Sequence, residues 1–292
     1  MRYTAEEVIK GLRNPHVAFR ELNRRYYSSK KSYYSEGIDI LEQDWDNLII
    51  LDACRYDIFE KYADTLPGNL SVVQSRAGTT EEFLRGNFQD AGLNDTICLT
   101  TNAWYEKLRD DLNAGFHQLE YREYNTPQKL ADDALELEKS HKDKRFIIHF
   151  LPPHTPYVGP TADKHLPPYE DQHGILSDFY QNDVSEETIQ KAYRENIERV
   201  LPEVKRLVGS FTGKTVVTAD HGELLGDRIG PIPIREWGHY KNLYVSELIK
   251  VPWLVVESDT RKDIVAEETN DRQDGRLSET VDDRLEKLGY KV

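Results

Sequence analysis

The stretch WDNLIILDACRYDIFEKYA, residues 45–63, decides the fold class of this chain. It opens with an unbroken apolar run over residues 48–51, which is typical of a strand that is buried on both faces. Helical periodicity follows the run, and Asp52 stands between the two patterns. The stretch therefore predicts a strand, a turn and a helix, with Asp52 at the carboxyl end of the strand.

Four later segments also contain apolar strand patterns. They are DTICLTTNAWYEKL at 95–108, KRFIIHFLPPHTPY at 144–157, GKTVVTADHGELLG at 213–226 and VPWLVV at 251–256. Helical patterns between them cover residues 127–142 and 185–211, and Pro202 is expected to kink or divide the second of these helices. Strands that alternate with helices predict an α/β fold with a doubly wound, mostly parallel central sheet and helices on both faces.

The chain length of 292 residues suits one large domain with a sizeable core. Residues 1–44 are interpreted as a helical and polar N-terminal extension, and residues 45–292 as a single α/β domain. An irregular segment at 159–182, rich in Pro, His and Asp, predicts a lid or specificity loop. The acidic tail after Ser258 is expected to end in a short helix over residues 280–290.

The composition excludes several classes of partner and site. A formal charge of -14 predicts an acidic surface that repels nucleic acid. The chain shows no apolar run of the length of a signal peptide or a membrane span, so a cytoplasmic protein is expected. The two cysteines, Cys54 and Cys98, provide neither a disulfide framework nor a thiolate cluster for zinc. Any metal must therefore be held by oxygen and imidazole ligands, and the oligomeric state stays open.

Asp52, Asp220 and His221 are the candidate metal ligands. Each follows an apolar strand, and open α/β sheets bind ligands beyond the carboxyl ends of their strands. Two carboxylates in one crevice repel each other unless a cation or a proton joins them, so a metal is predicted. The alternative for Asp52 is a structural cap. The alternative for Asp220 is a helix capping box with Glu223.

Two histidines stand in loops at predicted strand ends, His154 in LPPHTPY and His239 in EWGHYK, and we interpret them as residues of the same site. His149 alternates in facing with Ile148 inside a strand and is interpreted as structural. The other histidines are interpreted as surface or core residues with satisfied nitrogens; they are His16, His117, His141, His165 and His173.

Taken in order, the segments around Asp52, His154, Asp220 and His239, followed by VPWLVV, resemble the sulfatase-like branch of the alkaline phosphatase superfamily over about residues 45–290. The resemblance implies that Asp52 binds metal and that a metal-bound side-chain nucleophile lies between the first two strands. Thr80, in the segment SVVQSRAGTTEEFL at 71–84, is the first choice for both roles. Thr79 is the second choice, and its alternative role is a capping box with Glu82.

Departures from the sulfatase pattern favour phosphate over sulfate. The chain lacks the Cys/Ser-x-Pro-x-Arg motif from which sulfatases make formylglycine, and Cys54 is interpreted as a packing residue. Asp220 and His221 stand where calcium sulfatases tend to have Asp-Asn, and an imidazole ligand favours zinc or manganese over calcium. In using Thr and Asp-His the chain resembles phosphoethanolamine and lipoteichoic acid transferases.

The resemblance implies a metal-dependent hydrolase or transferase, with one or two ions, that acts on phosphate monoesters or diesters through a covalent Thr intermediate. A glycan or lipid-linked sugar is the substrate class that analogy with the family suggests. His154 and His239 are candidate leaving-group acids, phosphate donors or ligands of a second metal. Arg55 and Lys241 are candidates for binding the anion, and their alternatives are a partner of Asp57 and a solvated side chain. The alternative functions are a sulfatase without formylglycine and a non-catalytic protein that binds an anion or glycan.

Overall fold

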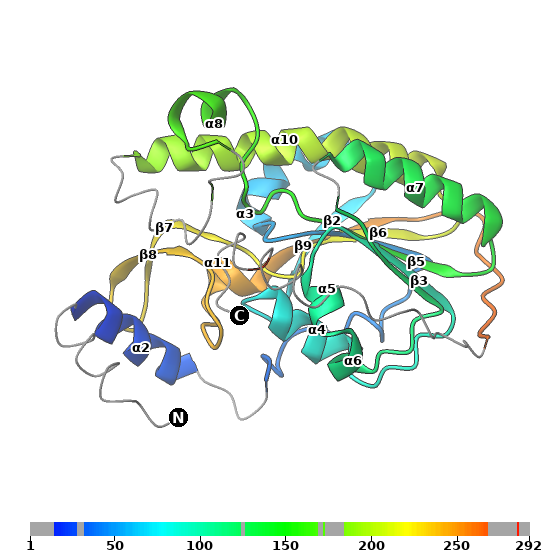
Figure 1. The fold of residues 1–292 in the computed structure, drawn as a ribbon, viewed down its shortest axis with the longest axis horizontal. Coiled ribbons are helices and arrows are strands. Elements are labelled where there is room, and N and C mark those ends of the chain that lie inside the picture. Colours follow the sequence, from blue (N-terminus) through cyan, green and yellow to red (C-terminus); the bar gives the residue numbers. More distant parts are fainter. Residues whose placement is uncertain are drawn as a thin grey trace.

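The computed structural model describes residues 15–27, 32–123, 126–168, 172, 184–267 and 285. Its centre is a seven-stranded sheet in the order β2-β9-β6-β1-β5-β3-β4 (Figure 1). The strands are β1 (Asn47–Leu51), β2 (Asn69–Gln74), β3 (Thr96–Thr100), β4 (Gln118–Tyr121), β5 (Arg145–Phe150), β6 (Thr215–Thr218) and β9 (Lys250–Val256). Strand β9 is antiparallel to its two neighbours, β2 and β6, and the other pairings in this sheet are parallel, so the predicted mostly parallel sheet is confirmed.

Strand β1 occupies the middle of the sheet and fixes the place of the site. It pairs in parallel with β5 on one side and β6 on the other, so that Ile49 faces Ile148 and Val217. All five residues of β1 are buried, as the unbroken apolar run requires. Because these three strands are parallel neighbours, the residues that follow them gather at one edge of the sheet.

Helices cover both faces of the sheet, which confirms the doubly wound architecture. Figure 1 shows α7 (Pro127–Ser140) and α10 (Glu186–Ser210) along one face and α4 (Thr80–Phe88), α5 (Trp104–Lys107) and α6 (Arg109–Leu112) on the other. Side chains of β1 alternate between the two cores: Ile49 and Leu51 pack under α7 and α10, and Leu48 and Ile50 pack against α4 and α5. Helix α10 continues through Pro202 as one 25-residue helix, so the expected division of this helix does not occur.

A two-stranded antiparallel hairpin, β7 (Leu224–Ile229) and β8 (Ile234–Gly238), projects beside the main sheet. Helix α2 (Pro15–Tyr27) packs against it. The Asn23 amide bonds both backbone groups of Ile232, and Arg20 pairs with buried Glu236 at 2.7 Å. The described part of the N-terminal extension is therefore attached to the hairpin.

Short helices complete the fold: α3 (Tyr56–Phe59), a 3-10 turn (Glu60–Thr65), α8 (Pro160–His165) and α11 (Ser246–Ile249). Helix α8 opens the predicted lid segment, of which residues 169–171 and 173–182 lie outside the described residues. The predicted helix at 280–290 lies outside them as well, except for Leu285.

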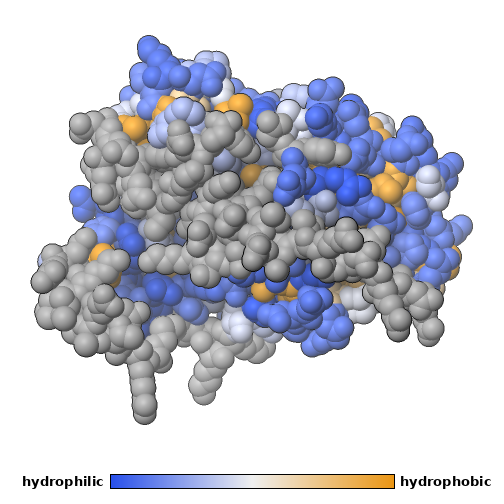
Figure 2. All heavy atoms as spheres, viewed as in Figure 1, coloured by the Kyte–Doolittle hydropathy of each residue, from blue (hydrophilic) through white to orange (hydrophobic). Residues whose placement is uncertain are grey.

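The described surface is polar. Figure 2 shows hydrophilic side chains over most of the described face in view, in keeping with the formal charge of -14. Among the described helices, none combines the length and the apolar character that a membrane crossing requires.

Candidate metal centre and active site

The predicted metal ligands meet at the edge of the sheet where β1 and β6 end. Asp52 directly follows β1, and Asp220 and His221 follow β6. Thr80 is the first residue of α4, and all four residues are fully buried. Together with His149 of β5 they form what we call the carboxylate cluster.

Short distances connect the members of the carboxylate cluster. Thr80 Oγ1 donates a hydrogen bond of 2.8 Å to Asp220 Oδ2 and lies 3.4 Å from His221 Nε2. His221 Nε2 lies 3.4 Å from Asp220 Oδ2 and 3.7 Å from Asp52 Oδ1. The structure thus brings together the four residues that the sequence singled out as metal ligands.

Backbone contacts orient the ligand atoms. His221 Nδ1 lies 2.7 Å from the carbonyl of Gly222, so its N–H donates there and the lone pair of Nε2 faces the carboxylates. Asp220 Oδ1 accepts hydrogen bonds from the backbone N–H groups of Ala53 and His221, at 3.0 and 2.9 Å. These contacts hold Asp220 Oδ2 toward Thr80 and His221.

Two carboxylates buried side by side in the carboxylate cluster need a proton or a cation between them. Burial, together with the negative charge of Asp220, raises the pKa of Asp52 well above its usual range. Burial also opposes ionisation of Asp220, but His221, His149 and hydrogen bonds from Ala53 and Thr80 outweigh it and lower the pKa of Asp220. Burial lowers the pKa of His221 and favours its neutral form.

A divalent metal fits this donor set. Asp52 Oδ1 is buried and has no hydrogen-bond partner among the described residues. Two carboxylates, a neutral imidazole and a hydroxyl are the ligands that zinc or manganese accepts. A cation would bind the unpartnered Oδ1 of Asp52 and offset the repulsion between the two carboxylates.

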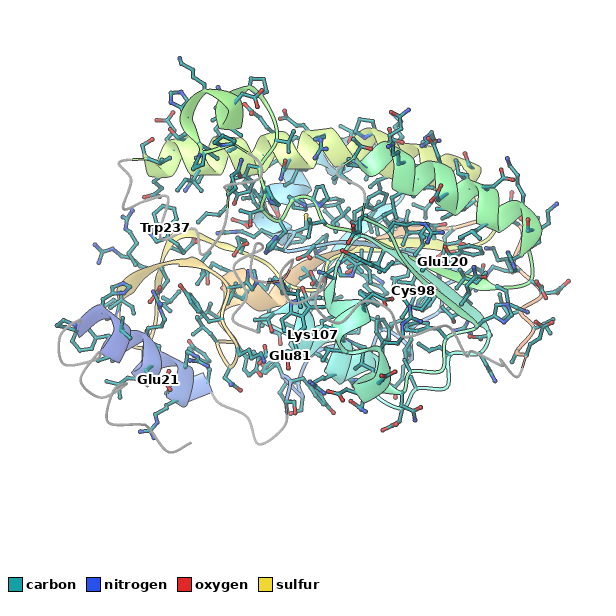
Figure 3. The ribbon with its side chains drawn as sticks, viewed as in Figure 1. Glu21, Glu81, Cys98, Lys107, Glu120 and Trp237 are labelled. Atoms are coloured by element: carbon teal, nitrogen blue, oxygen red, sulfur yellow. The ribbon has the colours of Figure 1, made fainter. Side chains whose placement is uncertain are left out.

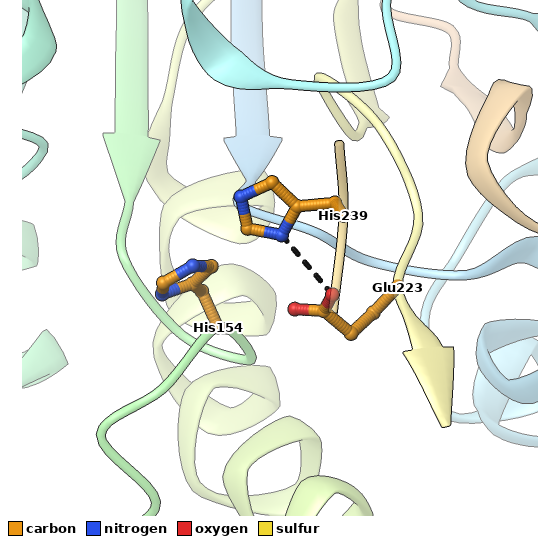
Figure 4. Close-up of side chains that lie close together, drawn as sticks. All are labelled: His154, Glu223 and His239. Carbon is orange, nitrogen blue, oxygen red and sulfur yellow. Dashed lines mark hydrogen bonds and ion pairs between the residues drawn. The ribbon is translucent and has the colours of Figure 1, made fainter. Parts of the chain in front are cut away.

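A second group, the histidine cluster, consists of His154, Glu223 and His239. Figure 4 shows the three side chains converging from the loop after β5, the segment before β7 and the end of β8. His239 Nδ1 lies 3.0 Å from Glu223 Oε1, and the rings of His154 and His239 lie 5.2 Å apart. The His239 ring also lies 4.5 Å from that of His221, so the two clusters are neighbours.

Burial controls the charges of the histidine cluster. It raises the pKa of Glu223 to about 7, against the opposing effect of His154 and His221. Burial lowers the pKa of His154 and of His239 to about 4. One ligand atom from each of the three residues lies within 4.8 Å of the others, a spacing that suits a second cation.

The two threonines divide the roles that the sequence left open between them. Thr79 is the N-cap of α4, and its side chain accepts a hydrogen bond from the backbone N–H of Glu82. Glu82 in turn accepts from the backbone N–H of Gly78 at 3.0 Å. Thr79 therefore caps the helix, and Thr80 faces the carboxylates.

In the sequence analysis Glu223 had only the alternative role of a capping partner of Asp220, and Asn102 was not identified. The capping box of Asp220 with Glu223 does not form, because within the fully described stretch 213–256 the residues after Asp220 lead into β7 and not into a helix. Asn102 Nδ2 donates to Asp52 Oδ2 at 2.5 Å and lies 3.4 Å from Thr80 Oγ1. Its position just after the apolar run of β3 is the signal that could have identified it.

Arg55 and Lys241 contact other groups than the carboxylate cluster. The Arg55 guanidinium donates hydrogen bonds to Asp57 at 2.9 Å and to Asp227 at 2.6 Å. The contact with Asp57 is the alternative role that the sequence suggested for Arg55. Lys241 forms an ion pair with Glu81 and is half-exposed. The prediction that these two cations bind the substrate anion stays a prediction.

No protein-family model and no curated protein matches the sequence. Among solved structures, the chain is similar to the C-terminal periplasmic domain of the phosphoethanolamine transferase EptC from Campylobacter jejuni (14% identity, 73% of this chain, 78% of that chain, TM-score 0.47). It is also similar to the C-terminal periplasmic domain of EcEptC from Escherichia coli in complex with Zn (16% identity, 79% of this chain, 78% of that chain, TM-score 0.46). A third similar structure is a protein in the alkaline phosphatase superfamily from Vibrio parahaemolyticus (13% identity, 84% of this chain, 70% of that chain, TM-score 0.39).

The comparisons contradict the expectation of a cytoplasmic protein, because two of these similar structures are periplasmic domains. That expectation rested on the lack of an apolar leader in the sequence, and such a lack does not determine the compartment of a chain. The likeness to these structures concerns the fold, and it agrees with the resemblance to the alkaline phosphatase superfamily that the sequence motifs carry.

Proposed function

We propose that this chain transfers or hydrolyses phosphate esters, with Thr80 as the nucleophile and a divalent cation held by Asp52, Asp220 and His221. The observation that carries the proposal is the position of the Thr80 hydroxyl. It is fully buried, starts a helix, donates to Asp220 at 2.8 Å and lies 3.4 Å from His221 Nε2. A hydroxyl placed among metal ligands at a helix N-terminus suits attack on an anionic ester.

The residues of the chain supply the two halves of a displacement reaction. Thr80 Oγ1 forms a bond to phosphorus, its proton moves toward Asp220 Oδ2, and the ester oxygen leaves. A water or an acceptor hydroxyl then attacks the same phosphorus and releases Thr80, which regains its proton. A bound zinc or manganese ion would lower the pKa of the Thr80 hydroxyl and offset the charge of the phosphate.

The histidine cluster is placed to handle the proton of the leaving group. His239 bonds Glu223 through Nδ1, and this pair can deliver a proton to the departing oxygen and take one from the incoming water. Asn102, at 3.4 Å from Thr80 Oγ1, holds Asp52 and places amide hydrogens beside the nucleophile.

A test combines metal analysis with a panel of aryl phosphate, phosphodiester and sulfate esters. We expect the protein to bind zinc or manganese and to turn over phosphate esters in preference to sulfate esters. Thr80→Ala should abolish turnover while metal remains bound. Thr79→Ala is the matched control: it should cost about 1 kcal/mol of stability through the lost helix cap and remain active.

Two results would refute the proposal. A protein that binds no metal and acts on none of the esters lacks the proposed activity. A Thr80→Ala variant that keeps full turnover excludes a covalent intermediate on Thr80.

A further inference from the structure

His149 is a buried polar side chain to which the proposed reaction gives no role. It lies in β5, pairs in register with Ile50 of β1 and Thr100 of β3, and is fully buried. The alternation of β5 predicted a structural role for it. In the structure its ring faces Asp52 and Asp220, and each of its two nitrogens has a distinct environment.

Nδ1 of His149 has a hydrogen-bond partner that can accept the ring proton. His149 Nδ1 lies 3.0 Å from the Tyr105 hydroxyl, which is also hydrogen-bonded to the thiol of Cys98. Cys98, labelled in Figure 3, lies on β3. When the Tyr105 hydroxyl donates to the sulfur, its oxygen accepts from His149 Nδ1–H. In that arrangement the lone pair of the ring is on Nε2, which is the tautomer that can bind a metal.

Nε2 faces Asp52 and Asp220 without bonding either. It lies 4.0 Å from Asp52 Oδ2 and 3.9 Å from Asp220 Oδ2, and both distances are too long for hydrogen bonds. No group in the described part of the chain bonds this nitrogen. Asp52 Oδ1 is unpartnered in the same way, so two orphaned ligand atoms occur in one cluster.

The spacing of these atoms matches a shared cation. Nitrogen and oxygen ligands stand about 2.0–2.2 Å from zinc, so two ligands of one ion are separated by up to about 4 Å. Ligand atoms of Asp52, His149 and Asp220 all lie within 4.8 Å of one another. A small contraction of the cluster around an ion would give every orphaned atom a partner.

We propose that Nε2 of His149 is a further ligand of the cation that Asp52, Asp220 and His221 hold. This inference rests on the proposed function, since it adds a ligand to the metal of that reaction. The ligands then come from all three central strands, β1, β5 and β6. Two imidazoles beside two carboxylates favour zinc or manganese over calcium.

Two substitutions at position 149 separate ligation from packing. In His149→Asn the amide can keep the bond to Tyr105 but supplies no atom at the place of Nε2. In His149→Gln the longer amide reaches that place. Both are made in a His239→Ala background, in which the neighbouring histidine cluster lacks one of its three possible ligands. Zinc binding is measured by competition with a chelator and by the metal-induced rise in Tm.

We expect His149→Asn to weaken binding of the first zinc ion at least tenfold, as the loss of a ligand requires. The metal-induced rise in Tm should shrink, and the Tm of the metal-free protein should stay close to that of the background. His149→Gln should weaken binding less. Binding of zinc by His149→Asn with the affinity of the background would overturn the proposal.

A second measurement leaves position 149 unchanged and applies even where its variants do not fold. X-ray absorption on the His239→Ala protein with one equivalent of zinc counts the imidazole ligands. Two imidazoles support His149 as a ligand, and one imidazole overturns it. A wild-type protein that binds no zinc or manganese would instead refute the proposed function itself.

Discussion

The carboxylate cluster and the histidine cluster lie side by side but are built differently. The first combines two buried carboxylates with neutral imidazoles, and its residues stand in or directly after strands of the central sheet or begin a helix. The second has one carboxylate for two imidazoles, and its residues stand in loops and at the end of the hairpin. At the sheet edge two buried carboxylates lie close enough to need a proton or a cation between them, whereas in the second cluster two imidazoles accompany a single carboxylate.

The largest expected effect is that of Asp52→Asn, which should change stability and activity in opposite directions. Loss of the carboxylate removes the cost of burying an acid there and its repulsion with Asp220, so the Tm of the metal-free protein at neutral pH should rise by on the order of 2–4 °C. The same change removes a metal ligand, so turnover should fall by about 100-fold or more. Calorimetry without metal and steady-state kinetics with metal measure the two effects. A lower Tm of the metal-free variant would contradict the claim that the Asp52 carboxylate destabilises the metal-free protein.

Glu223→Gln tests the other side of the comparison. It keeps the shape of the side chain but weakens the contact with His239, so turnover should fall by roughly 10- to 100-fold. Binding of the first metal ion should stay as in the wild type, because Glu223 lies outside the carboxylate cluster. If the first ion is lost as well, the two clusters form one site.

Asn102→Ala should have a smaller effect, about tenfold on turnover. The substitution removes the amide that bonds Asp52 and lies beside Thr80, while the metal ligands themselves stay. Kinetics together with metal content measure it. Asn102→Asp is the informative companion, because a third carboxylate should strengthen metal binding while it repels the substrate anion.

Lys241→Met should have the smallest effect, no more than about threefold on turnover. Lys241 pairs with Glu81 at the surface, and exposed ion pairs contribute little. A strong rise in KM for an aryl phosphate would instead support the sequence-based prediction that Lys241 binds the anion.

Sequence patterns predicted the centre of the fold well and its periphery poorly. The run ending at Asp52 and the run before Asp220 are apolar because their strands are buried on both faces, so both were recognised. Strand β2 is largely exposed, and its sequence lacks the continuous apolar run by which the buried strands were recognised, so it was not predicted. The β7–β8 hairpin carries an irregular register between Leu225 and Asp227 and was likewise not predicted.

The same distinction applies to the candidate site. Asp52, Asp220 and His221 could be proposed because they follow apolar runs along the chain. Thr80 and Thr79 could not be separated, because the contacts that distinguish them, from Thr79 to Glu82 and from Thr80 to Asp220, appear only in the folded chain. His149 was interpreted as structural, and its place beside Asp52 and Asp220 could not be predicted, since an alternating strand pattern does not show that a neighbouring strand places carboxylates beside one face.

The attachment of α2 to the hairpin has a consequence for how the molecule assembles. Asn23 and Ile232 are 209 positions apart in the sequence, and Arg20 and Glu236 are 216 apart. Contacts between such distant segments form slowly, because a long loop must close before they contribute. The β8 strand that leads to His239 thus gains the contacts with α2 only when the N-terminal extension reaches the hairpin, and we expect catalytic competence to appear after the central sheet has folded.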